Sequence, residues 1–259
     1  RTFPASISAI GMYVRILDLR NNQITALPQE FKTFTNLEEL NVCHNKLISL
    51  PKDLGYCRNL RFIRASHNCL QKIHSSCFNC HMTKLVEMHL DFNKLTSLPN
   101  TLHLLPDLME INVEYNQLTE LPVDLHQSPK LYGIHASHNR ITKIPDNISE
   151  YSKLRKLYLA DNQIKCVPKS MRKLSTLSFF DLWDNPIIDI FKKEGLEAII
   201  EDDEVTIVPQ DQTQVSDQLS STTTATSSTT KDAKTEEENQ TILHRFIYSL
   251  LPEPQTQAA

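Results

Sequence analysis

The stretch LMEINVEYNQLTELPVDLHQSPK, residues 108–130, repeats the pattern of LEELNVCHNKLISLPKDLGYCRN, residues 37–59. Both fit L-x-x-L-x-L-x-x-N-x-L-x-x-L-P-x-x-L, where L stands for any apolar residue. The pattern begins at eight positions, 23 residues apart except for one interval of 25: Val14, Leu37, Leu60, Leu85, Leu108, Leu131, Leu154 and Leu177. A fixed period of this length is the signature of stacked structural repeats.

Apolar residues alternate near the start of every copy, as Leu157 and Leu159 do. Alternation with a period of two predicts a short strand with one buried face. A single copy cannot bury all its apolar side chains, so neighbouring copies must stack and share one core. Each Leu or Ile buried in this core contributes roughly 1.5–3 kcal/mol of transfer free energy.

Proline and asparagine also recur with the same period. Pro follows the fourth apolar position in six copies: Pro28, Pro51, Pro99, Pro122, Pro145 and Pro168. Asn recurs in all eight: Asn22, Asn45, Asn68, Asn93, Asn116, Asn139, Asn162 and Asn185. The pattern resembles the leucine-rich repeat family, specifically its intracellular, Ras-group type with 23-residue repeats. The resemblance implies an α/β solenoid, or horseshoe, with a parallel sheet on its concave side. It also implies that the Asn column lies inside the turn, where its amides satisfy backbone groups of adjacent coils.

The repeats predict a leucine-rich repeat region over 1–186, made of a half-repeat, seven full repeats from Val14 and a terminal eighth. The half-repeat has the spacing of the second half of a copy in four residues: Phe3, Pro4, Ile7 and Ile10. We therefore expect a strand-bearing half to precede Arg1.

Four segments are predicted after the repeats. Residues 187–208 indicate a helical C-terminal cap over the last coil. Residues 209–240 are poor in apolar residues and rich in Ser, Thr and acids, which predicts a disordered linker. In 241–252 the apolar residues fall at helical spacing and predict a short amphipathic helix, which would dock on the solenoid, in a partner groove or on a membrane surface. Residues 253–259 are expected to be disordered, so a disordered tail follows the solenoid.

Composition excludes several classes of function. The net charge is −4 and the pI about 6.2, which gives no support for nucleic-acid binding. No apolar run is long enough for a membrane span. The chain has four glycines and neither phosphate-binding motif, G-x-x-x-x-G-K-[ST] or G-x-G-x-x-G. We therefore expect no enzymatic activity and no cofactor.

The motif C-x-x-C-H at Cys77, Cys80 and His81, with His74 upstream, is compatible with zinc or haem attachment. In the repeat frame, however, Cys77 falls at a buried apolar position, and either Cys80 or Met82 fills the next one. A free Cys behaves as a small buried hydrophobe. We therefore predict no metal, while a zinc site of these four residues stays an alternative. All six cysteines lie inside repeats rather than in paired caps, which favours a reducing, cytoplasmic location.

Four positions in each repeat, two on the strand and two just after it, are predicted to face solvent on the concave side. Aromatic residues and Arg dominate interface energetics, and concave solenoid surfaces are the usual binding faces. The predicted partner-binding stripe is Phe62, Arg64, His89, Asp91, Glu114, Tyr115, Tyr158 and Trp183. The alternative is that these aromatic side chains cover each other, and that Trp183 and Phe179 belong to the C-terminal cap.

Histidines recur at the same outward positions. They are His44, His67, His89, His135 and His138, and two of them, His44 and His67, are neighbours across adjacent repeats. A metal site, a pH-sensitive interface and plain solvated surface are all compatible with this pattern.

These features predict a non-enzymatic protein–protein interaction scaffold that binds a partner on its concave face. Ras-group members act in small-GTPase and phosphatase signalling, so the resemblance implies partners of these kinds. The alternative is an adaptor or substrate receptor in a larger assembly such as a ubiquitin ligase. We expect neither a nucleic-acid partner nor a membrane span.

Overall fold

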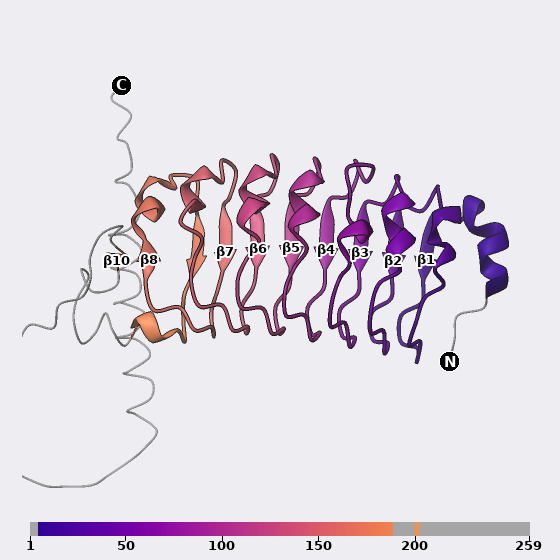
Figure 1. Ribbon diagram of the computed structural model, residues 1–259, viewed down its shortest axis with the longest axis horizontal. Helices are drawn as coiled ribbons and strands as arrows, with labels where there is room; N and C mark the ends of the chain where they lie inside the picture. The colour runs from indigo at the N-terminus through magenta and orange to yellow at the C-terminus, as the bar shows by residue number, and fades with distance from the viewer. Residues whose placement is uncertain (1–4, 189–199, 202–259) are drawn as a thin grey trace, which may run out of the picture.

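The computed structural model describes residues 5–188 and 200–201, which form an open solenoid (Figure 1). Each repeat contributes one short strand to an eight-stranded parallel sheet, in which the strands follow one another in chain order. The strands are β1 (Ile16–Asp18), β2 (Glu39–Asn41), β3 (Phe62–Arg64), β4 (Glu87–His89), β5 (Glu110–Asn112), β6 (Gly133–His135), β7 (Lys156–Tyr158) and β9 (Phe179–Asp181). The predicted leucine-rich repeat fold is confirmed.

The register of the sheet follows the sequence period. Ile16 pairs with Glu39, and Glu39 pairs with Phe62, so equivalent residues stand side by side. Phe62 then pairs with Glu87 across the longer interval. The two extra residues therefore lie in the connection between these strands and leave the sheet register intact.

Short 3₁₀ helices form the return segments and stack beside one another (Figure 1). They are η1 (Ala5–Tyr13), η2 (Glu30–Thr33), η3 (Lys52–Tyr56), η4 (Ser75–Cys77), η5 (Asn100–Leu104), η6 (Val123–Gln127), η7 (Ile148–Glu150) and η8 (Lys169–Lys173). A proline with φ between −58° and −70° directly precedes four of them, at Pro51, Pro99, Pro122 and Pro168. The proline ring fixes φ near this value, so it prepares the chain for the turn.

The core lies between the strands and the return segments. In the repeat that begins at Leu108, the core contains Leu108, Ile111, Val113 and Leu118, which are all completely buried. Equivalent residues of the neighbouring repeats are buried too, so the core is continuous along the solenoid. This continuity explains why stacking, rather than any single repeat, stabilises the fold.

The Asn column lies inside the turns, as predicted. The Asn116 side-chain amide donates to the carbonyls of Leu90, Val113 and Glu114 at 3.0–3.1 Å. Its carbonyl oxygen accepts from the backbone N–H of Leu95 at 2.9 Å. One side chain therefore satisfies backbone groups of two adjacent coils that are remote from water.

In the longer repeat, one cysteine of the C-x-x-C-H motif is buried and the other is exposed. Cys77 is buried, as predicted, and Met82 fills the next inward position, whereas Cys80 is exposed. Phe78 is also buried, which the repeat frame did not predict. A Cβ atom on Gly55 would lie 2.4 Å from the carbonyl oxygen of Ser76, so the inserted loop packs closely only because a glycine faces it.

The two ends of the repeat region differ from its middle. Ile10 is 53% exposed, although the equivalent Phe34 is buried, because no described coil packs on its outer side. At the other end β10 (Ile200–Glu201) pairs in parallel with β8 (Val167–Pro168). The predicted cap at 187–208 is described only at 187–188 and 200–201, and the predicted segments 209–240, 241–252 and 253–259 lie outside the described residues. No helix among the described residues is long and apolar enough to cross a membrane.

Candidate partner-binding surface

The outward side of the strands, together with the turn that follows each strand, is here named the sheet face. In β5 the middle residue, Ile111, is buried, whereas Glu110 and Asn112 on either side are half-buried. This alternation places the predicted outward columns on the sheet face. The prediction of solvent exposure is wrong at Asn41, Gly133 and Ser137, which are buried.

Phe62 and Arg64 of the predicted stripe lie together. The Arg64 guanidinium carbon is 5.5 Å from the centre of the Phe62 ring, and that of Arg61 is 5.3 Å away. Arg64 also forms an ion pair with Glu39 of the neighbouring strand. This end of the sheet face therefore presents an aromatic ring flanked by two guanidinium groups.

The middle of the predicted stripe is polar. His89 Nε2 lies 3.5 Å from Glu87 Oε2, and the Ser66 hydroxyl donates to Asp91 Oδ1 at 2.6 Å. Glu114 is half-buried beside them in the next repeat. The structure thus separates Phe62 and Arg64 from the remaining aromatic residues of the stripe by a polar zone.

Tyr115 belongs to a row of stacked rings, named here the ring ladder: His44, His67, Phe92, Tyr115 and His138. Successive ring centres are 4.0–4.3 Å apart, and the planes differ by 9–14°. Phe92 and Tyr115 remain 40% and 42% exposed. His138 extends the row through Nδ1, which lies 2.7 Å from Asp161 Oδ2. The ladder is a continuous aromatic strip along five repeats.

All members of the ring ladder have a left-handed backbone conformation, which residues other than glycine rarely adopt. In every repeat the residue just before the Asn column has a positive φ of 50–58°: Asn21, His44, His67, Phe92, Tyr115, His138, Asp161 and Asp184. Left-handed backbone costs roughly 1 kcal/mol for a residue with a Cβ. Stacking offsets part of this cost, because each aromatic pair contributes about 0.5–1.5 kcal/mol. The sequence stripe included only Tyr115 of these five, although the recurrence of His, Phe or Tyr at one repeat position was a visible signal.

Tyr158 stacks on His135, which lies outside the predicted stripe, with ring centres 4.8 Å apart. His135 Nε2 lies 2.8 Å from Glu110 Oε1, and the Tyr132 hydroxyl donates to Glu110 Oε2 at 2.6 Å. Trp183, the last member of the stripe, is half-buried. Sequence reasoning missed Glu110 as the centre of this polar group.

The surroundings of Glu110 set the ionisation of two groups. Burial by itself raises the pKa of Glu110, but the Tyr132 hydrogen bond and the nearby bases His135 and Lys156 outweigh it and lower that pKa. The same hydrogen bond, with burial, raises the pKa of Tyr132 to about 12. A Cβ atom on Gly133 would lie 3.1 Å from Glu110 Cγ, so the absent side chain leaves room for this carboxylate.

Metal ligands do not gather in the described part of the chain. Within it, no group of three or more His, Cys, Asp or Glu side chains is arranged to hold a metal ion. His74 Nδ1 instead lies 2.9 Å from Ser76 Oγ. Burial raises the pKa of the Cys77 thiol to about 11, so this sulfur is protonated at neutral pH.

The comparisons with known proteins agree with the fold. The family model described as leucine rich repeat matches residues 13–70, 83–141 and 129–187, so the chain belongs to the leucine-rich repeat family. No curated protein sequence matches the chain. Domains of this family generally mediate protein–protein interaction and are typically non-enzymatic.

Solved structures of several leucine-rich repeat proteins are similar. A leucine-rich repeat protein of Leptospira interrogans has 28% identity and a TM-score of 0.66, over 78% of this chain and 52% of that one. The ectodomain of the Arabidopsis thaliana receptor kinase GASSHO1/SCHENGEN3, in complex with CASPARIAN STRIP INTEGRITY FACTOR 2, has 29% identity and a TM-score of 0.63, over 71% and 23%. The plant peptide hormone receptor RGFR1 in complex with RGF2 has 24% identity and a TM-score of 0.62, over 71% and 34%, which shows the fold alone. The chain thus spans about half the length of the Leptospira protein and a third or less of the two plant receptors.

Proposed function

We propose that the chain is a non-enzymatic scaffold of the 23-residue, Ras-group type, which binds a partner protein through the sheet face. The observation that carries this proposal is the ring ladder, because its rings lie outside the hydrophobic core that holds neighbouring repeats together. Phe62 with its guanidinium neighbours, and Tyr158 on His135, add two further aromatic contact points. Aromatic residues and Arg are the side chains on which interface affinity usually depends.

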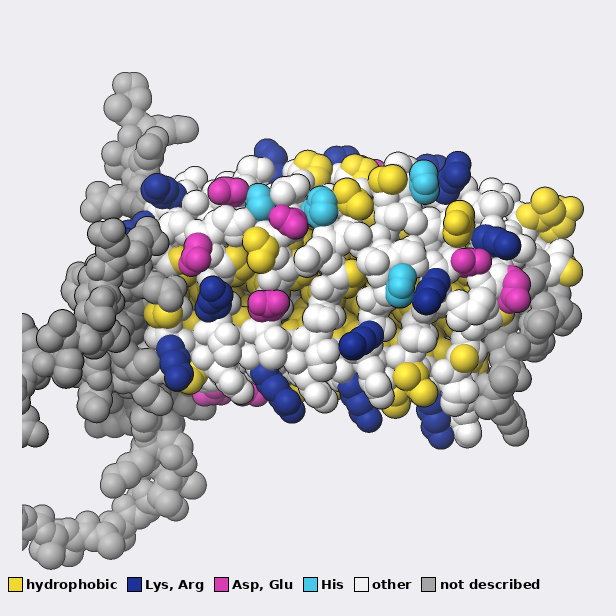
Figure 2. Space-filling model, viewed as in Figure 1, with side chains coloured by type: hydrophobic (Ala, Val, Ile, Leu, Met, Phe, Trp, Pro, Cys, Tyr) yellow, Lys and Arg dark blue, Asp and Glu magenta, His cyan; other side chains and the backbone are white. Residues whose placement is uncertain are grey.

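The character of the surface supports a protein partner rather than nucleic acid. Figure 2 shows charged, polar and apolar side chains mixed over one side of the molecule, with Lys and Arg gathered along its lower edge. The chain as a whole is mildly acidic, with a net charge of −4. The receptor kinase ectodomain that resembles this chain was solved in complex with CASPARIAN STRIP INTEGRITY FACTOR 2, which supports binding as the role of the fold.

The six cysteines lie inside the repeats rather than in paired caps, which supports a reducing, cytoplasmic setting. The repeat type then makes a small GTPase or a phosphatase the first partner to test.

The test is affinity capture from cell lysate with the full chain, followed by mass spectrometry. A sheet-face variant carries Phe62→Ala, Tyr115→Ala and Tyr158→Ala. The control variant removes three exposed apolar side chains from the return segments, through Tyr56→Ala, Leu104→Ala and Val123→Ala. We expect the sheet-face variant to lose its specific partners while the control keeps them, once circular dichroism shows that both fold.

Loss of the partners in the control variant alone would place the binding site on the return segments and reject the proposal. Recovery of several subunits of one larger assembly, lost together in the sheet-face variant, would favour the adaptor alternative over a single signalling partner.

A further inference from the structure

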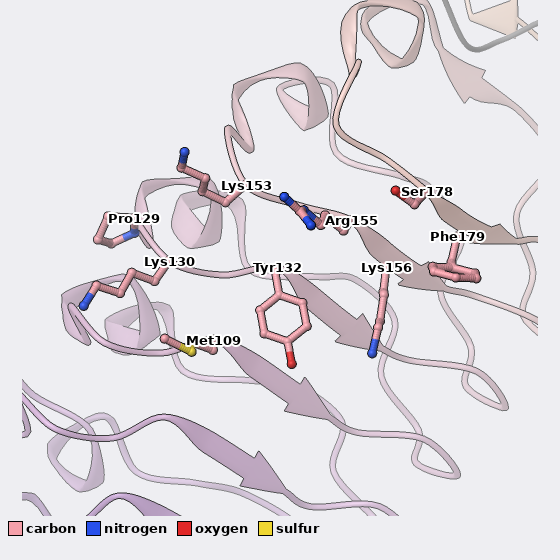
Figure 3. A pocket seen from close by; sticks show the side chains of 9 residues that line it. All are labelled: Met109, Pro129, Lys130, Tyr132, Lys153, Arg155, Lys156, Ser178 and Phe179. Atoms are coloured by element: carbon pink, nitrogen blue, oxygen red, sulfur yellow. The ribbon is translucent and has the colours of Figure 1, made fainter. Parts of the chain in front are cut away.

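A pocket of about 580 Å³ opens beside the starts of four consecutive strands, away from the ring ladder (Figure 3). Four of its lining residues directly precede strands β5, β6, β7 and β9 and are equivalent in the repeat: Met109, Tyr132, Arg155 and Ser178. The pocket is therefore elongated across the strands. It shares no residue with the predicted stripe.

The apolar wall of the pocket is held in place. Tyr132, Lys156 and Phe179 project in the same direction from neighbouring strands (Figure 3). The Tyr132 hydroxyl is fixed by Glu110, and Lys156 Nζ lies 5.5 Å from the centre of the Tyr132 ring. Phe179 is 55% exposed, although its ring is large and apolar. Lys156 stands between the two rings, so the exposed ring of Phe179 is the apolar contact that the pocket offers to another side chain (Figure 3).

The rim of the pocket carries an excess of positive charge. Its cations are Lys130, Lys153, Arg155 and Lys156. Lys130 Nζ is 2.8 Å from Asp107 Oδ1, and Lys156 lies near Glu110. Lys153 and Arg155 are exposed, and neither has an ion-pair partner among the described residues. An Arg side chain can bind a carboxylate through two parallel hydrogen bonds, so these two cations suit an anionic ligand.

The dimensions favour an extended chain over a compact molecule. Adjacent strands of a sheet are about 4.8 Å apart, so three steps from β5 to β9 cover about 14 Å. An extended peptide advances about 3.3 Å per residue, so about four residues fit across the pocket. Nucleic acid would need a longer basic stripe than two unpaired cations provide.

We propose that this pocket binds an extended acidic peptide segment of a partner protein. A carboxylate of the segment pairs with Arg155 and Lys153, and an aromatic or aliphatic side chain next to it packs on the exposed ring of Phe179. This site lies at the edge of the sheet face where the strands begin and contains no residue of the predicted stripe, so one partner with two contact segments, or two partners, can bind the same solenoid.

The test uses the full chain and the fluorescein-labelled peptide Glu-Glu-Phe-Glu-Glu-Leu, with binding followed by fluorescence anisotropy at low and high salt. Arg155→Gln replaces the guanidinium with a shorter, uncharged amide, and we expect it to weaken binding about tenfold. Phe179→Ala removes one wall, and a peptide with Gln in place of every Glu removes the charge of the ligand; both should weaken binding clearly. Lys94→Gln, an exposed lysine outside the pocket, should bind the peptide like the wild type.

The sheet-face triple variant separates this proposal from the proposed function, because it should bind the peptide normally. Equal binding by Arg155→Gln and Lys94→Gln would overturn the peptide site. So would the absence of binding at millimolar peptide, or tighter binding of a single-stranded RNA oligonucleotide that depends on the same two side chains.

Discussion

Tyr115 and Asn116 are neighbours in the chain, yet they belong to columns with opposite properties. The Asn column is the same in every repeat and buried in all but the first, whereas the ring column varies among Asn, His, Phe, Tyr and Asp. The Asn116 side chain satisfies backbone groups of two coils, but the Tyr115 ring next to it is exposed and stacks on the rings of Phe92 and His138.

The difference shows how one turn separates stability from recognition. The buried position must provide both donors and an acceptor in fixed places, and an amide of the right length does so. The outer position must only tolerate positive φ, so its side chain is free to change. Substitutions at buried and exposed positions of the solenoid test this separation.

Asn116→Ala should lower the free energy of unfolding by about 3 kcal/mol, because it leaves several buried backbone groups without partners. Urea denaturation followed by circular dichroism measures this loss. Asn100→Ala, at an exposed site on η5, is the control and should change stability by no more than about 0.5 kcal/mol. Similar losses in the two variants would remove the structural role assigned to the Asn column.

Tyr115→Ala should cost about 1 kcal/mol, because two stacking contacts are lost but no buried polar group is exposed. Tyr115→Gly should cost less, since glycine adopts positive φ without strain. A double-mutant cycle with Phe92→Ala should show a coupling of about 0.5–1.5 kcal/mol between the two rings. Additive effects would mean that the rings are adjacent without stabilising each other.

Glu110→Gln tests an outer residue that does carry structural interactions. The pKa of Glu110 is lowered in the folded chain, so the ionised carboxylate stabilises the fold above its usual pKa of 4.5. That stabilisation is lost as the pH falls through the lowered value. Wild type should therefore be more stable than the variant at pH 7, and the difference should shrink as the pH falls below 4.5 and through the lowered pKa.

Thermal melts between pH 7 and pH 3 measure this difference. Glu120→Gln, at an exposed position outside the cluster, controls for the general loss of one negative charge. A difference that stays constant with pH would show that Glu110 contributes by its shape and not by its charge.

Cys77 and Cys80 extend the comparison of buried and exposed positions to the longer repeat. Here the substitution Cys80→Ser should have the smallest effect on stability. Cys80 is exposed and should react quickly with a thiol reagent at pH 8, whereas Cys77 is buried, with its pKa raised to about 11 by burial, and should react only on unfolding. Mass spectrometry of the labelled peptides assigns the sites, and Cys80→Ser should fold normally. Fast labelling of Cys77 in the native chain would contradict its buried position.

The fold was predictable because its determinants repeat. The Leu, Pro and Asn positions each recur with one period, and the sheet register follows that period directly. Buried Phe78 was missed because it lies in the two-residue insertion, where the repeat frame gives no position.

The surface was predictable only in part, because side-chain contacts between repeats depend on rotamers as well as on columns. The outward columns identified Tyr115 but not the ladder of rings that continues on both sides of it. The pocket beside Arg155 escaped prediction because most of its lining residues precede the strands, whereas the predicted outward positions began at the first strand residue.

The most direct test of the division between the columns is hydroxyl-radical footprinting of the full chain, alone and in complex with a captured partner. Aromatic side chains are oxidised in proportion to their exposure, so the free chain supplies its own reference. The account predicts that oxidation of Phe92, Tyr115 and Tyr158 falls in the complex while Tyr56 on η3 is unchanged. Protection of Tyr56, with the three sheet-face residues oxidised as in the free chain, would contradict it.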